Sequence, residues 1–145
     1  MIKIKESDVV YKLDKSVCNL NEIQIPENAT VFDASDCSNF CDLKGLQKYS
    51  NLRVLLLKGT DINGSDLNLI SSNIKEIDIR HCKNIKNYSR LPKRKETPIR
   101  VLISFVGERI LNTMPDEVDI EFEGWLNTIT RKKTPTVFIK QNTRI

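Results

Sequence analysis

This 145-residue sequence has few aromatic residues, a single histidine and no long apolar run. Aromatic residues make up 6% of the chain, so the stacking surfaces that hold single-stranded nucleic acid are scarce. No apolar stretch approaches the ~18 residues of a transmembrane helix, so no membrane span is expected. The N-terminal stretch MIKIKESDVVYKLD lacks the apolar segment of a secretory signal, which favours a cytoplasmic protein.

The single histidine also restricts catalysis. A nucleophile needs a base beside it, so a Cys–His or Ser–His–Asp site would depend on His81 alone. The neighbouring Cys82 would face the opposite way on an extended chain. The sequence contains no G-x-S-x-G motif, no phosphate-binding loop and no dinucleotide fingerprint. We therefore expect a protein that is not an enzyme, with no catalytic residue and no cofactor.

The four cysteines are expected to be free thiols in a reducing cytosol. A zinc site usually combines two separated ligand pairs. Here the pair Cys37 and Cys41 would have to join His81 and Cys82, whose adjacent side chains seldom reach one metal ion together. We therefore expect no metal site.

What is present fits one folded domain. Hydrophobic residues make up 39% of the chain and charged residues 29%, as in ordinary globular proteins. The net charge of +4 is too small by itself to indicate nucleic acid binding.

Three segments of the chain share one pattern. They are Ala29–Cys37, Leu52–Thr60 and Ile74–Cys82, whose starts are 23 and 22 residues apart. Each has apolar residues at offsets 0, 3 and 5, followed by Cys or Thr at offset 8. The apolar stretch predicts a short strand with alternating sides. The apolar residues spaced by three that follow it predict a short helical return.

This pattern resembles the leucine-rich repeat, LxxLxLxx(N/C/T), which has a period of 20–29 residues. The resemblance is clearest over residues 42–62 and covers roughly half of the chain. It implies an α/β solenoid that is strand-rich overall, with short parallel strands on a concave side and irregular, 3-10 or short helical returns. Several repeats must stack, because one repeat cannot bury its apolar face alone. In that family the residue at offset 8 bonds backbone groups of adjacent turns.

The resemblance predicts a single domain over residues 1–145. Residues 1–28 form an N-terminal cap with one or two strands, and residues 29–92 are the regular repeats. Residues 93–145 contain degenerate repeats or a C-terminal cap, with strands expected over residues 98–105, 118–122 and 136–140. A different C-terminal element is the alternative.

Side chains between the inward residues should point from the concave side toward a partner. These candidates for partner binding are Val54, Leu56, Lys58, Glu76, Asp78, Arg80, Val101, Ile103, Phe105, Asp119 and Glu121. An apolar patch beside charged residues is typical of a protein-binding surface. A one-residue slip in the strand that begins at Ile99 is the alternative there, which would place Val101, Ile103 and Phe105 in the core. The carboxylates of residues 116–123 also fit a solvated strand edge.

The sequence therefore predicts a cytoplasmic, non-enzymatic module that binds another protein through its concave face, as a small regulator, inhibitor or effector. The alternative is a regulator that binds nucleic acid through two basic loops, at residues 90–100 and 131–133. Binding through such loops would weaken steeply with salt.

Overall fold

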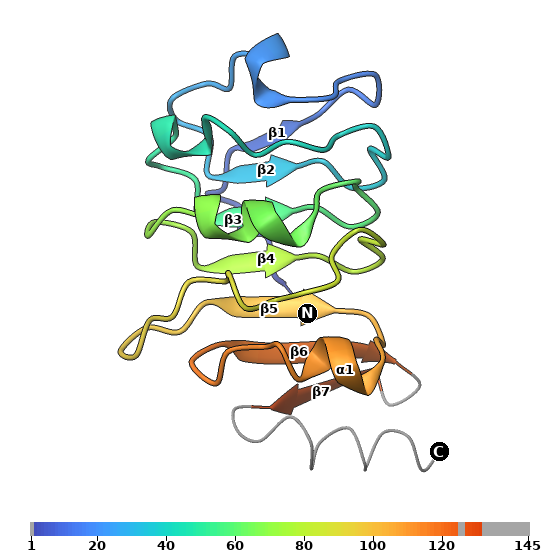
Figure 1. Ribbon diagram of the computed structural model, residues 1–145. Helices are drawn as coiled ribbons and strands as arrows, with labels where there is room; N and C mark the ends of the chain where they lie inside the picture. Colours follow the sequence, from blue (N-terminus) through green and yellow to red (C-terminus); the bar gives the residue numbers. More distant parts are fainter. Residues whose placement is uncertain (1, 125–126, 132–145) are drawn as a thin grey trace.

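The strands form one open sheet whose order follows the sequence (Figure 1). A computed structural model describes residues 2–124 and 127–131. Strands β1 to β6 are parallel, and β7 runs antiparallel to β6. The strands are β1 (Val10–Lys12), β2 (Val31–Asp33), β3 (Val54–Leu56), β4 (Glu76–Asp78), β5 (Arg100–Ile103), β6 (Asp119–Gly124) and β7 (Asn127–Arg131).

Short helices lie in the segments that connect the parallel strands. They are η1 (Leu20–Glu22), η2 (Leu46–Lys48), η3 (Gly64–Leu69) and α1 (Glu108–Leu111). Asn19 and Asn63 cap η1 and η3, because their side-chain oxygens accept the backbone N–H two residues on. The expected strand-rich fold with parallel strands and short helices is therefore present. None of the described helices is long and apolar enough to cross a membrane.

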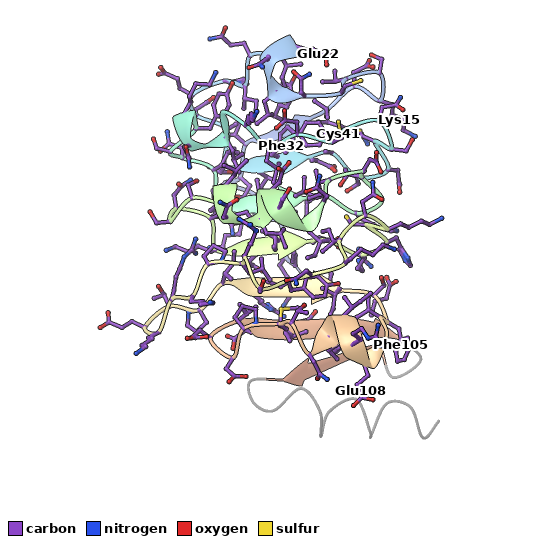
Figure 2. All side chains as sticks on the ribbon, viewed as in Figure 1. Lys15, Glu22, Phe32, Cys41, Phe105 and Glu108 are labelled. Atoms are coloured by element: carbon purple, nitrogen blue, oxygen red, sulfur yellow. The ribbon has the colours of Figure 1, made fainter. Side chains whose placement is uncertain are left out.

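The core lies between the sheet and these connecting segments. Phe32, Leu55 and Ile77 are direct partners across β2, β3 and β4, and each is fully buried. Figure 2 labels Phe32 on β2. Because equal positions pair in successive strands, the core residues form rows. One row is Tyr11, Phe32, Leu55, Ile77, Val101 and Ile120. A second row, two residues on, is Leu13, Ala34, Leu57, Ile79, Ile103 and Phe122.

The chain turns in the same way after β2, β3 and β4. Asp36, Gly59 and His81 have φ angles of 63°, 74° and 58°, in the left-handed region. These residues occupy the same position, offset 7, in the three segments that share the sequence pattern. Only glycine adopts this conformation without a steric cost, so Asp36 and His81 are held there by their surroundings.

The residue after each turn is buried and bonds backbone carbonyls. The thiol of Cys37 approaches the Leu13 carbonyl at 3.6 Å, and the thiol of Cys82 approaches the Leu57 carbonyl at 3.0 Å. Both contacts join neighbouring turns of the chain. The Thr60 hydroxyl donates to the same Leu57 carbonyl at 2.7 Å. The Thr60 backbone N–H also donates to the Leu57 carbonyl, at 3.1 Å, so these side chains add to the hydrogen bonding of the turns.

The strand that follows Ile99 has the slipped register. Val101 lies opposite Ile77, so Val101 and Ile103 belong to the core and not to the face on which we expected them. Leu102 points the other way, although it is 2% exposed. Phe105 follows the strand and is 60% exposed, so it does not belong to the core as the slipped register would require. The apolar run is compatible with both registers, and the pairing with β4 selects one.

The ends of the chain differ in part from the expected pattern. Residues 2–28 contain one strand, β1, and residues 20–28 contain η1 and no strand. The strand expected over residues 118–122 corresponds to β6. The strand expected over residues 136–140 lies outside the described residues.

Candidate functional site

The face of the sheet opposite the core, here called the outer face, carries the side chains that alternate with the core rows. Its first row is Val31, Val54, Glu76, Arg100 and Asp119, and its second row is Asp33, Leu56, Asp78, Leu102 and Glu121. Lys58 and Arg80 continue the alternation directly after β3 and β4. The outer face thus collects most of the predicted partner-binding residues, apart from Val101, Ile103 and Phe105.

A chain of alternating charges crosses the outer face. Arg53, which precedes β3, pairs with Asp8 and lies 3.6 Å from the Glu76 carboxylate. Arg100 lies 3.7 Å from the other oxygen of Glu76 and also pairs with Glu121. Each arginine therefore bridges two carboxylates, and Glu76 joins the two arginines. The chain links residues from before β1 to β6.

A second charged cluster lies at the end of β4. The Arg80 guanidinium pairs with Asp78 at 2.8 Å and with Glu123 of β6. The hydrogen bond that Arg80 donates to Asp78, together with the nearby carboxylates, raises the pKa of Arg80. Burial raises the pKa of Glu123, but the hydrogen bonds and charges of Arg80 and His81 outweigh it and leave that pKa below its ordinary value. The His81 ring lies 3.3 Å from Glu123.

The apolar residues of the outer face are covered. Val31 and Val54 are 0% exposed although neither belongs to the core cluster, and Leu56 is half-buried. Side chains on the open face of a sheet contact water unless another segment lies over them. A further segment of the chain therefore has to lie on this face.

The N-terminal arm, residues 2–8, lies on this side of the sheet. Figure 1 shows its trace leaving β1, passing behind β2, β3 and β4 and ending level with β5. Helices η3 and α1 are drawn in front of the same strands, so the arm and these helices lie on opposite sides of the sheet. The predicted partner-binding surface is thus partly occupied by the protein's own N-terminus.

Asp8 attaches the arm to the sheet. Its carboxylate accepts hydrogen bonds from Arg53, one of them at 3.1 Å, and from the Thr30 hydroxyl at 2.9 Å. The Asp8 side chain is 3% exposed. The hydrogen bond from Arg53 is the main reason that the pKa of Asp8 falls from 3.8 to about 2.

Phe105 and the two predicted basic loops have different surroundings from the outer-face residues. Phe105 lies beside α1 (Figure 2) and lines a cavity of about 400 Å³ together with His81, Ile85 and Ile110. In the basic loop at residues 90–100, the Arg94 guanidinium donates to the carbonyls of Ser71 and Ile74. Of the loop at residues 131–133, only the backbone of residue 131 is described.

The cysteine thiols do not gather into a ligand set. Burial raises the pKa of Cys37 and of Cys82, which disfavours the thiolate that a metal ion would bind. Within residues 2–124 and 127–131, no three His, Cys, Asp or Glu side chains are placed to hold a metal ion.

Asp8 and Arg53 were missed by the sequence reasoning. They are 45 residues apart, and no local pattern connects them. Arg53 follows the first apolar residue of the segment Leu52–Thr60, a position to which the sequence pattern assigns no role. No family model, curated protein or solved structure matches this chain.

Proposed function

We propose that this chain is a leucine-rich-repeat solenoid that binds a partner protein through its outer face and catalyses no reaction. The row of direct partners Phe32, Leu55 and Ile77 supports the repeat, because stacked repeats place equal positions side by side. The contacts of Cys37 and Cys82 with carbonyls of neighbouring turns also fit the role of offset 8 in that family.

The observation that carries the proposed binding function is the composition of the outer face. Half-buried Leu56 lies beside charged groups that are held in place by ion pairs, such as Glu76 and Arg80. Charges fixed before binding lose little freedom when a partner arrives, so they favour specific recognition. The outer face in this proposal is the concave side of the solenoid.

Partner capture followed by competition tests this function. A partner purified with the wild-type chain from its native cell should bind at least about tenfold more weakly to Leu56→Arg and Lys58→Glu, because both change the outer face. The matched control is Lys44→Glu, an exposed residue of a connecting segment. Equal binding of the partner to all four chains, each with a wild-type circular dichroism spectrum, would place its contact surface elsewhere.

A further inference from the structure

The N-terminal arm covers the outer face while remaining exposed itself. Ile4 is 44% exposed, and residues 3–7 are all exposed, whereas Val31 and Val54 beneath are fully buried. Among the hydrogen bonds of the described residues, those joining the arm to the rest of the chain are made by Asp8, to Arg53 and Thr30. Within residues 2–8 the arm is thus attached through Asp8, and residues 3–7 face water.

A segment that is exposed to water over most of its length is suited to exchange with another segment. The outer face needs aliphatic contact at Val31 and Val54. Without Asp8, the partly buried Arg53 would lose its closer carboxylate and keep its 3.6 Å contact with Glu76, which is costly for a poorly hydrated cation. Toward these needs the arm offers a half-buried isoleucine at position 2 and a carboxylate at position 8, whereas Ile4 is 44% exposed. Any extended peptide with the same chemistry would meet them equally well.

We propose that the outer face is a docking site for an extended peptide segment, and that the N-terminal arm is its resident occupant, which a partner segment must displace. The expected partner segment has aliphatic residues followed by a carboxylate that replaces Asp8 on Arg53. This inference rests on the proposed function. The arm has a built-in advantage, since its covalent link gives an effective concentration of roughly millimolar. A partner therefore binds weakly until the contact between Asp8 and Arg53 is lost.

A peptide exchange in the full-length chain tests this inference. The probe is a fluorescent synthetic peptide of residues 2–9, IKIKESDV, and its binding is followed by fluorescence anisotropy. We expect the peptide to bind Asp8→Asn at least tenfold more tightly than the wild type, because the variant's own arm no longer pairs with Arg53. The matched control is Asp14→Asn, which removes the same charge from an exposed residue whose carboxylate accepts from nearby Ser16. It should bind the peptide as the wild type does.

A second peptide, with Asn in place of its Asp, should bind Asp8→Asn at least tenfold more weakly than the first. Hydrogen exchange should show faster exchange of the amides of residues 2–8 in Asp8→Asn and unchanged exchange in β3. Ile2→Asp, which changes the arm without touching Arg53, should release the arm in the same way. Equal binding of the two peptides to Asp8→Asn would overturn the inference. It would also be overturned if neither Asp8→Asn nor Ile2→Asp showed faster exchange of the arm or tighter peptide binding than the wild type.

These outcomes are separable from those of the proposed function, since the peptide experiment uses no external partner. A captured partner that depends on Leu56 but binds the wild type and Asp8→Asn equally would overturn the displacement of the arm and leave partner binding intact. If the peptide exchanges as expected but no captured partner depends on Leu56 and Lys58, the displacement of the arm stands and the proposed partner binding is overturned.

Discussion

Single arginine residues determine how charge is arranged on the outer face. Arg53, Arg80 and Arg100 each contact two carboxylates that come from different parts of the sequence. The side chains of Asp78 and Glu121 are only 6% and 4% exposed. A carboxylate so poorly hydrated requires a nearby cation, and guanidinium groups supply two-pronged hydrogen bonds to it. Loss of one arginine would therefore affect several strands together.

Asp8→Asn should lower the free energy of unfolding at pH 7 by about 1–2 kcal/mol, because it removes a charged hydrogen-bond acceptor of Arg53. The pKa of Asp8 in the folded chain, about 2, lies below the ordinary value of 3.8. The wild-type carboxylate therefore stabilises the fold above about pH 4, and this contribution is lost as the pH falls toward 2. Urea unfolding at several pH values measures the difference.

The stability difference between the wild type and Asp8→Asn should thus shrink as the pH falls from 4 toward 2. Asp14→Asn serves as the control for charge alone, since its carboxylate contacts only Ser16 among the hydrogen bonds of the described residues. A difference that stays constant between pH 7 and pH 2.5 would contradict the role of the Asp8 carboxylate.

Within a strand, neighbouring leucines have unequal roles. Leu55 is fully buried in the core cluster, whereas Leu56 is half-buried on the outer face. The alternation follows from the strand geometry, which sends successive side chains to opposite faces. Strand β3 therefore supplies both the core and the candidate site from residues of the same type.

Leu55→Ala should reduce the free energy of unfolding by about 3 kcal/mol, because it leaves a cavity in the core. Leu56→Ala should cost about 1 kcal/mol or less, since water already reaches part of its side chain. Urea unfolding of the two variants provides the comparison. Similar losses in both variants would indicate that the covered outer face contributes as much to stability as the core.

The molecule as a whole is built from contacts between successive strands. Each of β2 to β5 pairs only with the strand before it and the strand after it, and β1 pairs with β2 alone among the described strands. A disturbance in one strand therefore spreads first to its two neighbours. The series of ion pairs from Asp8 to Glu121 also connects parts of the sheet that are not neighbouring strands.

Hydrogen exchange of Leu55→Ala should show this pattern. The amides of β2 and β4 should exchange faster than in the wild type, and those of β6 should change less, because β6 lies three strands from the cavity. Mass spectrometry of peptic fragments resolves these regions. Equal acceleration in all strands would show that the sheet opens only as a single cooperative unit.

The sequence predicted the parallel strands around Phe32, Leu55 and Ile77, because their apolar spacing recurs at nearly constant intervals. It misplaced Val101 and Ile103, since a continuous apolar run fits two registers. The sequence also predicted that the N-terminus forms a cap. The alternating isoleucine and lysine residues near its start do not indicate the surface on which this segment lies. Pairs such as Asp8 and Arg53 come from distant segments and have no local pattern.

The sequence by itself determined that strands lie around Phe32, Leu55 and Ile77 and that these side chains face the core, because alternation and period are local properties of the chain. Only the tertiary structure decided the register of β5 and the pairing of charges across strands. It also placed residues 2–8 on the outer face, since that position depends on a contact between Asp8 and Arg53 that forms only once the sheet has assembled.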